Sequence, residues 1–267
     1  MGAYYNEIEP YAAQWLRNLI KAGHIAEGDV DERSIVEVEA SDLRKYDQCH
    51  FFAGIGAWSY ALRSAGWADD RKVWTGSCPC QPFSTAGTKR GFADERHLWP
   101  VWAKLIAQCR PDVLFGEQVA NRAALEWLDV VRGDLERNGY AVGAIDLCAA
   151  SVGAPHIRQR LYWVADARHG RRQEREPILA ESVRSPRGEG PTQANGIARQ
   201  GSSSFWIPTE WLECDDGKKR PTEPGLCPLA YGPANRMGRI RAYGNALVAP
   251  VAEAFVRAYM DVATGCG

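Results

Sequence analysis

The sequence QCHFFAGIGAWSYALRSAG, residues 48–66, has the form of a buried strand, a glycine turn and an amphipathic helix. The apolar run Gln48–Ala53 predicts the strand, and apolar residues at helical spacing predict a helix that ends at Gly66. A strand that leads directly into a helix is the repeating unit of α/β folds with parallel sheets. This segment therefore indicates an α/β fold.

The same alternation continues on both sides of that segment. Further strands are expected at Ala3–Ile8, Val73–Gly76, Asp112–Gly116, Tyr140–Leu147 and Leu161–Ala165. Helices are expected with apolar stripes of Ala12, Trp15, Leu16, Leu19 and Ile20; of Leu98, Trp102, Leu105, Ile106 and Cys109; of Leu125, Leu128, Val131 and Leu135; and of Val248, Val251, Phe255, Tyr259 and Val262. We interpret each stripe as core, and the fold class as α/β with a mostly parallel, Rossmann-like sheet.

The chain has 267 residues, enough for one large domain or one domain with a small lobe. Between Arg171 and Ser204, Gly, Pro and Ser supply 12 of 34 residues and helical or strand periodicity is lost. Such a composition cannot bury enough apolar surface to offset its ordering entropy. We expect a long loop or mobile insert there.

The net charge is −1, but the charge is unevenly distributed. Residues 158–241 hold 15 Lys and Arg against 10 Asp and Glu, which suits a nucleic acid partner or, equally, a solvated basic loop. No apolar run approaches the ~20 residues of a membrane-spanning helix. The first residues, MGAYYNEIEP, do not resemble an export signal. We therefore expect a cytoplasmic protein whose eight cysteines are thiols.

Two turns at expected strand ends hold candidate site residues. In Phe52–Gly56 the glycines allow a ligand to approach a helix N-terminus, although close strand–helix packing also requires glycine. The turn SCPCQPFS, residues 77–84, offers either a nucleophilic cysteine or a buried one. A zinc site is disfavoured, because Cys214 and Cys227 give no second ligand pair at suitable spacing.

Charged side chains stand near two more strand ends. Glu117 ends the run VLFGE, where a partly buried carboxyl group can act as an acid or can simply cap the next helix. Arg158 and Arg160 are two residues apart at the start of a strand, so both side chains point the same way. Together they can hold a carboxylate or a phosphate.

In this order, these pieces resemble the cytosine-5 DNA methyltransferases. CPCQPFSTAG is similar to the family's Pro-Cys-Gln loop, with Pro79 and with Cys80 at the nucleophile. FGEQV is similar to its Glu-Asn-Val motif, with Glu117 matching and Gln118 in place of Asn. GAPHIRQRLYWV is similar to its Gln-x-Arg-x-Arg strand entry, with His156 at the Gln position and Arg158 and Arg160 at the two Arg positions.

The cofactor motifs of the family are also matched. FFAGIGAW resembles Phe-x-Gly-x-Gly through Phe52, Gly54 and Gly56. YGNALV resembles Gly-Asn-x-Val, with Asn245 matching and Leu247 at the Val position. His50 stands where the family has Asp, and Ala57 where it has Gly, so the contacts to the methionine end of the cofactor are open.

The order of the early motifs is rearranged. Gly54 and Cys80 are 26 residues apart, too close for the two βα units that separate these motifs in the family. Glu7 and Ile8 resemble the ribose-binding segment, and Asp29 and Val30 resemble the adenine-contacting segment, both upstream. The linker Asp31–Tyr46 would then carry the chain back across the sheet. Alternatively, residues 1–45 only mimic these motifs.

The resemblance implies methyl transfer from S-adenosylmethionine, without a metal, to carbon 5 of a flipped cytosine in double-stranded DNA. Cys80 would form the covalent adduct, with Glu117, Arg158 and Arg160 as the other catalytic residues. It implies a catalytic and cofactor domain at 1–166, a target-recognition region at 167–235 and a returning segment at 236–267. A monomer is expected, and the resemblance is compatible with a cognate restriction endonuclease as a partner. The alternatives are a tRNA cytosine-5 methyltransferase and a silent nucleic-acid-binding homologue, the latter prompted by Gln118 and His156.

Overall fold

The computed structural model describes residues 2–79, 98–154, 156–167, 210–213, 219–222 and 246–264. Three sequence expectations lie outside these ranges: the nucleophile Cys80, the cofactor residue Asn245 and the insert Arg171–Ser204. Residues 210–213 and 219–222 are described as backbone strands only, and most of the expected target-recognition region at 167–235 also lies outside the described residues.

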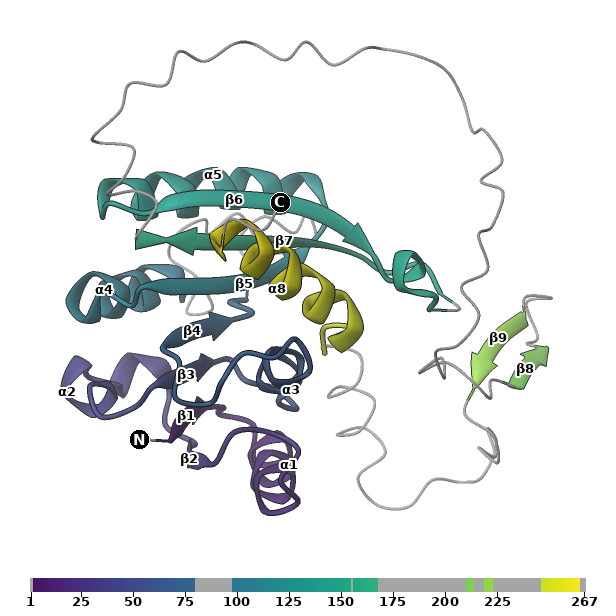
Figure 1. Cartoon of the computed structure of the whole chain (residues 1–267), viewed down its shortest axis with the longest axis horizontal. Helices are drawn as coiled ribbons and strands as arrows, with labels where there is room; N and C mark the ends of the chain where they lie inside the picture. Colours follow the sequence, from purple (N-terminus) through teal and green to yellow (C-terminus); the bar gives the residue numbers. More distant parts are fainter. Residues whose placement is uncertain are drawn as a thin grey trace, which may run out of the picture.

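A seven-stranded sheet forms the centre of the fold, in the order β2-β1-β3-β4-β5-β7-β6 (Figure 1). Its strands are β1 Ala3–Asn6, β2 Gly28–Asp31, β3 Gln48–Phe51, β4 Val73–Gly76, β5 Val113–Val119, β6 Ala141–Cys148 and β7 Gln159–Asp166. Strands β1 to β5 are parallel, and β7 runs antiparallel between β5 and β6. A separate antiparallel pair joins β8 Glu210–Glu213 and β9 Lys219–Thr222. The expected α/β fold with a mostly parallel sheet is confirmed.

Helices cover both faces of the sheet. They are α1 Pro10–Lys21, η1 Ile35–Glu37, α2 Ala40–Leu43, α3 Ala57–Ser64, α4 Trp99–Cys109, α5 Arg122–Arg137, η3 Ala149–Val152 and α8 Ala249–Thr264. Figure 1 shows α1, α3 and α8 on one side and α2 and α4 on the other, where α5 also packs into the same core cluster. None of the helices in the described part of the chain is both long enough and apolar enough to cross a membrane.

Two expected core positions are wrong. Leu125 is 55% exposed, because α5 buries the stripe that contains Trp127, which packs edge-on against Trp99. Val262 is 72% exposed in the last turn of α8, beyond the turns through which that helix packs on the core. Both residues fit helical spacing, but spacing alone does not set which part of a helix meets the sheet.

The early strands have the rearranged order expected from the sequence. Strand β1 lies between β2 and β3, so the chain must cross back over β1 after it leaves β2 at the sheet edge. The crossing segment contains η1 and α2, and it buries Ile35, Val38 and Leu43 against the sheet. The linker expected at Asp31–Tyr46 thus carries the chain across the sheet and also covers one of its faces.

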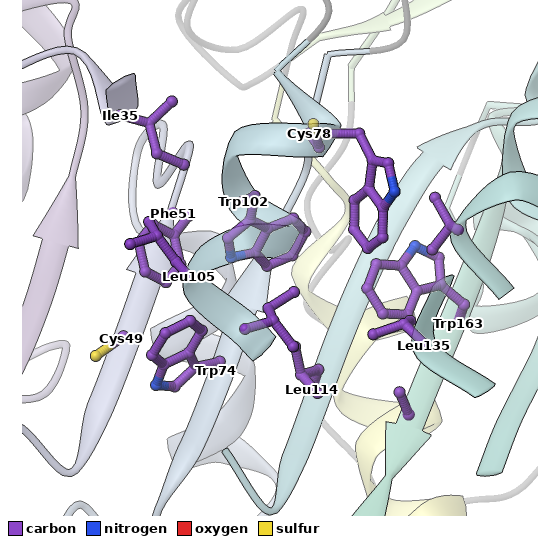
Figure 2. Close-up of a cluster of buried hydrophobic side chains, with 14 of the residues drawn as sticks. Ile35, Cys49, Phe51, Trp74, Cys78, Trp102, Leu105, Leu114, Leu135 and Trp163 are labelled. Atoms are coloured by element: carbon purple, nitrogen blue, oxygen red, sulfur yellow. The ribbon is translucent and has the colours of Figure 1, made fainter. Parts of the chain in front are cut away.

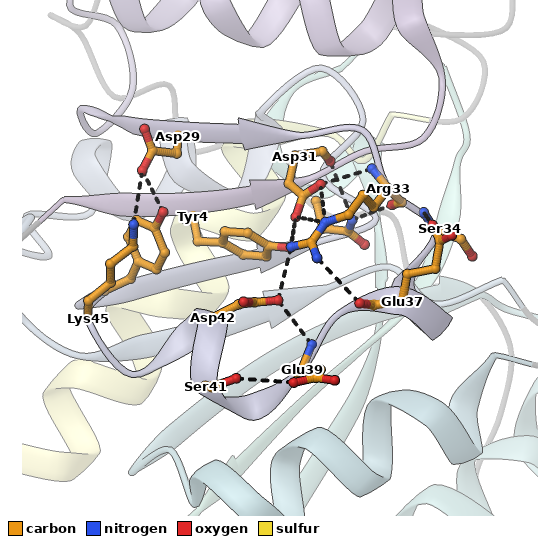
Figure 3. A network of polar contacts seen from close by, with 12 residues as sticks. Tyr4, Asp29, Asp31, Arg33, Ser34, Glu37, Glu39, Ser41, Asp42 and Lys45 are labelled. Carbon is orange, nitrogen blue, oxygen red and sulfur yellow. Dashed lines mark hydrogen bonds and ion pairs between the residues drawn. The ribbon is translucent and has the colours of Figure 1, made fainter.

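A polar network fastens this crossing segment to β2 (Figure 3). Arg33 pairs with Asp31 at 2.7 Å and with Asp42 at 3.0 Å. The Tyr4 hydroxyl donates to Asp31 at 2.7 Å, and the Asn6 amide donates to the Arg33 carbonyl at 2.8 Å. The side chains of β1 are therefore tied to the end of β2 and to the backbone of the segment that follows it.

His50 belongs to a buried polar row in the sheet. Its Nδ1 lies 2.8 Å from the Thr75 hydroxyl and its Nε2 lies 3.2 Å from Gln48 Oε1, while its ring stacks on Tyr5. Burial lowers the pKa of His50 to about 3, so the ring stays neutral at pH 7. With both ring nitrogens engaged inside the sheet, His50 has a structural role.

Two tryptophans pack where the central strands lack side chains. A Cβ on Gly76 would lie 2.6 Å from the Trp102 ring, and one on Gly116 would lie 2.0 Å from the Trp163 ring. The two rings are 6.0 Å apart and fully buried in the large core cluster of Figure 2. Glycine is required at both positions because the indoles fill the space of a Cβ.

We predict that Gly116→Ala lowers the free energy of unfolding by about 3 kcal/mol, because a methyl group there overlaps a fully packed indole. The matched control is Gly133→Ala in α5, where an added Cβ meets only Arg137 Nη1 at 3.7 Å. That change should raise the free energy of unfolding by about 0.5–1 kcal/mol through helix propensity. Urea denaturation of both variants measures the difference, and equal stability would contradict the packing argument.

Candidate active site

The ends of β4 and β5 bring the candidate catalytic residues together. Gly76 and Gly116 are paired in the parallel register, so Ser77 and Glu117 follow them at the same level of the sheet. This is the carboxyl edge of the parallel strands, where open α/β sheets place their ligands. Arg160 comes to the same place from β7, in which it pairs with Val119.

Glu117 lies in a buried, positively charged environment. Its Oε1 lies 2.9 Å from Arg160 Nε in an ion pair. Burial raises the pKa of Glu117, while hydrogen bonding from the Ser77 side chain and the positive charges of Arg160 and Arg158 act in the opposite direction. A carboxyl group with a raised pKa beside fixed positive charges is suited to proton transfer.

Arg158 connects this site to the chain's late segment. Its Nη2 donates to the Ala246 carbonyl at 2.7 Å. Burial and the neighbouring charge of Arg160 lower the pKa of Arg158. Leu247, expected at the cofactor, is buried in a core cluster with residues of α3 and α8. Residues 246–248, directly before α8, are therefore anchored beside β5 and β7.

The start of the cysteine turn is held from β5. Gln118 Nε2 donates to the Cys78 carbonyl at 2.8 Å, and the Val119 N–H donates to Gln118 Oε1 at 2.9 Å. Cys78 itself is 1% exposed and packs in the core cluster of Figure 2, whereas Pro79 is exposed. The chain thus leaves the core between Cys78 and Pro79, one residue before Cys80.

A second group of expected residues meets at the ends of β1 and β3. The Gly54 N–H donates to Glu7 Oε2 at 2.7 Å, and the Glu9 N–H donates to Glu7 Oε1 at 3.0 Å. Burial raises the pKa of Glu7. Ile8, next in the chain, is 64% exposed and offers an open apolar surface beside this carboxylate.

The glycine turn has a backbone that few other residues adopt. Phe52, Gly54 and Gly56 have φ values of 51°, 54° and 81°. A Cβ on Gly54 would meet nothing within 4 Å, so the turn is open at this point, whereas one on Gly56 would press on Leu16. Gly54 is therefore placed for a ligand, and Gly56 serves the packing of α3 against α1.

Asp29 and Val30 are not brought to this group. Asp29 pairs with Tyr4 in the register, three residues before Glu7, and its carboxylate accepts from the Tyr46 hydroxyl at 2.5 Å (Figure 3). Val30 is partly buried against the small cluster under α1. The acid nearest the end of β2 is Asp31, which pairs with Asn6.

Two residues of the site are absent from the sequence expectations. Ser77 hydrogen-bonds to Glu117, and the Trp58 indole donates to Ser77 Oγ at 3.3 Å. A signal for Ser77 does exist, since Thr75-Gly76-Ser77 and Phe115-Gly116-Glu117 both place a polar residue directly after a glycine at a strand end. Nothing in the sequence pattern of α3 separates Trp58 from an ordinary core residue.

Part of this arrangement matches a known family. Residues 67–196 match the family model of the C-5 cytosine-specific DNA methylases, and over this range the chain is similar to that family. The expected resemblance is confirmed, and the match contains the segments of Cys80, Glu117 and Arg160. The match begins after the glycine turn. The structure, and not the match, shows that residues 2–66 contribute strands to the same sheet.

The chain is similar to several bacterial enzymes of the family. It is 35% identical over 98 residues to the type II methyltransferase M.AplI of Arthrospira platensis, a match that covers 35% of this chain and 28% of the relative. It is 32% identical over 99 residues to M.HhaI of Haemophilus parahaemolyticus, covering 36% and 30%. The matched part thus spans about a third of the length of these curated relatives.

Solved structures with a similar fold include DNMT2 of Spodoptera frugiperda, with a TM-score of 0.43 and 18% identity, covering 61% of this chain and 41% of that one. The methyltransferase EhMeth of Entamoeba histolytica has a TM-score of 0.40 and 17% identity, covering 67% and 46%.

We predict that Gln118→Met lowers the free energy of unfolding by about 1–3 kcal/mol, the cost of two buried backbone groups that lose their partner. The thiol of Cys78 should also react faster with a thiol reagent, because its carbonyl is no longer held. The control is Gln14→Met on the exposed face of α1, which should change neither quantity. Stability and labelling equal to the wild type in Gln118→Met would show that this amide does not hold the turn.

Proposed function

We propose that this protein transfers a methyl group from S-adenosylmethionine to carbon 5 of cytosine in DNA. The observation that carries the proposal is the buried Glu117–Arg160 pair at the carboxyl edge of the sheet. It stands beside the end of β4, from which the chain leads into the Pro79-Cys80 segment. An acid, its positive partner and a cysteine are the three groups that the chemistry needs.

Carbon 5 of cytosine is a poor nucleophile because the ring is electron-deficient. The Cys80 thiolate adds to carbon 6, and the proton of Glu117 passes to ring N3 as that bond forms, so no full negative charge builds up on the base. The resulting enamine makes carbon 5 able to take a methyl group. Loss of the carbon 5 proton to a base then restores the double bond, releases Cys80 and returns the N3 proton to Glu117.

Arg160 and Arg158 orient the acid through this sequence. The charge-assisted bond from Arg160 fixes one carboxyl oxygen of Glu117 and stabilises its charged form after the proton has left. Arg158 adds positive charge nearby and ties the site to the backbone of Ala246. Burial raises the pKa of Glu117, which favours the protonated form that the transfer to N3 requires.

The residues at the ends of β1 and β3 fit the cofactor. S-adenosylmethionine supplies a methyl carbon attached to a positively charged sulfur. Glu7 can accept from the ribose hydroxyls while it is held by the Gly54 N–H, and the exposed Ile8 and the partly buried Phe52 offer apolar surface to the adenine. Pro79, Gly56, Asn245 and Leu247 are assigned to the cofactor, and Asp29 and Val30 to its adenine, by the resemblance alone.

Double-stranded DNA is the proposed substrate. The target carbon is inaccessible within a duplex, so the cytosine must be flipped out of the stack at a cost of a few kcal/mol. We assign target recognition to residues 167–235, which hold most of the basic stretch. A restriction endonuclease of the same specificity is a compatible partner, because the similar bacterial enzymes are type II methyltransferases.

We predict that Glu7→Ala weakens the binding of S-adenosylmethionine by about 1–3 kcal/mol, the range for losing hydrogen bonds to a charged group. Isothermal titration calorimetry measures the affinity. Glu9→Ala is the matched control, because this neighbouring acid caps α1 and has no contact with Gly54. Unchanged affinity in Glu7→Ala would make residues 1–45 an accessory segment.

The covalent step predicts a trapped complex. In DNA with 5-fluorocytosine at the target, carbon 5 cannot lose its fluorine after methyl transfer, so the adduct to Cys80 should persist. With S-adenosylmethionine, the wild type should form a protein–DNA complex that survives denaturant. Cys80→Ser should abolish the complex, and Cys78→Ala should retain it because Cys78 lies in the core.

Each result separates the proposal from its alternatives. An adduct mapped to Cys78, or methylation that survives in Cys80→Ser, would overturn the mechanism. Methylation of tRNA and not of DNA would assign the protein to the tRNA enzymes. Binding of nucleic acid without methyl transfer to either substrate would identify a silent homologue.

A further inference from the structure

We propose that Ser77 is a positioning residue for the reaction: it receives the indole N–H of Trp58 and directs its own proton to the carboxylate of Glu117. The inference rests on the proposed function, in which Glu117 is the acid. Ser77 would thus act on Glu117 together with the two arginines of the family motif. Through Trp58 it also connects Glu117 to the helix that follows the glycine turn.

The register of the sheet places the two side chains. Because Gly76 and Gly116 pair in neighbouring parallel strands, Ser77 and Glu117 are the next residues of β4 and β5 at the same edge. Glu117 Oε1 lies 2.9 Å from Arg160 Nε. The Ser77 side chain, next to it in the register, acts on the same carboxyl group by hydrogen bonding, which lowers its pKa. Glu117 is therefore held from β4 as well as from β7.

The direction of the Ser77 proton follows from its second partner. An indole nitrogen can only donate, so Trp58 Nε1, 3.3 Å from Ser77 Oγ, requires the hydroxyl oxygen to accept. The hydroxyl hydrogen is then left for Glu117, which accepts it best when ionised. The order Trp58, Ser77, Glu117 is a chain of donors that ends on a negative charge.

The Trp58 ring is itself fixed. It is buried, stacks on Phe115 at 6.0 Å between centroids and meets Tyr162 edge-on at 6.0 Å. Trp58 is the second residue of α3, the helix that begins at the glycine turn. The position of Ser77 is therefore set by packed aromatic rings, and it links the helix at the proposed cofactor turn to the acid.

Ser77 is the neutral member among the groups that act on Glu117. The charged and titratable ones are Arg160 and Arg158, which favour its ionised form, and the buried Tyr162 hydroxyl on β7. Removing the Ser77 hydroxyl takes away one contact that stabilises the ionised carboxylate of Glu117. Burial then raises the pKa of Glu117 further. Glu117 in Ser77→Ala should thus keep its proton to a higher pH than in the wild type.

The experiment compares Ser77→Ala with the wild type by a carboxyl ¹³C NMR titration of Glu117 in the full-length protein without substrate. We expect an upward shift of its titration midpoint in Ser77→Ala, a smaller upward shift in Trp58→Phe and return to the wild-type midpoint in Ser77→Thr. Ser41→Ala, a change at an exposed serine of α2, is the matched control and should leave the midpoint unchanged. Thermal unfolding verifies that each variant is folded.

The rate of methyl transfer to DNA gives the second measurement. Activity that needs protonated Glu117 falls as pH rises through its pKa, so the alkaline limb of kcat/KM should move to higher pH in Ser77→Ala. A serine with only a structural role would lower the rate equally at every pH, with the limb in place. An unchanged Glu117 titration in folded Ser77→Ala and Trp58→Phe overturns the inference.

The two proposals fail separately. A wild type that methylates no cytosine would overturn the proposed function, whereas the NMR titration would still decide whether Ser77 acts on Glu117. An active wild type with the same Glu117 midpoint in every Ser77 variant would overturn the role of Ser77 alone.

Discussion

The close approach of two indole rings to two glycines is the contact on which the rest of this structure depends. Trp102 and Trp163 lie against Gly76 and Gly116, at the ends of β4 and β5, closer than a Cβ would allow. Both rings are fully buried in the core cluster on one face of the sheet. They pack beside the paired residues Gly76 and Gly116, and Ser77 and Glu117 follow these glycines side by side and at one level.

The electrostatics of the site are set on the opposite face of the sheet, because the residue that follows Gly116 in the strand points away from the Trp163 ring. Burial there raises the pKa of the Glu117 carboxyl group. Arg160 and the Ser77 hydroxyl then work against burial from two neighbouring strands. A group balanced between desolvation and fixed donors can change its protonation state with little reorganisation, which is what proton transfer to a base requires.

The rearranged early strands show that position in the sheet matters more for this site than order in the chain. Glu7 precedes Gly54 by 47 residues, yet the parallel pairing of β1 with β3 brings the carboxylate to the glycine N–H. The added requirement is a segment that crosses β1, and here it is bound by Arg33 and by three buried apolar residues. The sheet can therefore hold its ligand residues with the strands supplied in a different order.

The sequence alone was sufficient for the fold class, for the resemblance to the family and for most of the candidate residues that meet at the site, because strand–turn–helix periodicity and short motifs are local properties. It also indicated the rearranged order, from the spacing of Gly54 and Cys80. It could not show that Leu125 is exposed and Trp127 buried, since both fit a helical stripe.

Only the tertiary structure decided which polar residues meet. In the structure Asp29 accepts a hydrogen bond from Tyr46, and Gln118 donates to the Cys78 carbonyl. Trp58 donates to Ser77, which acts on Glu117. Those contacts join residues from different strands and helices, and strand register and ring packing, which no local pattern encodes, determine them.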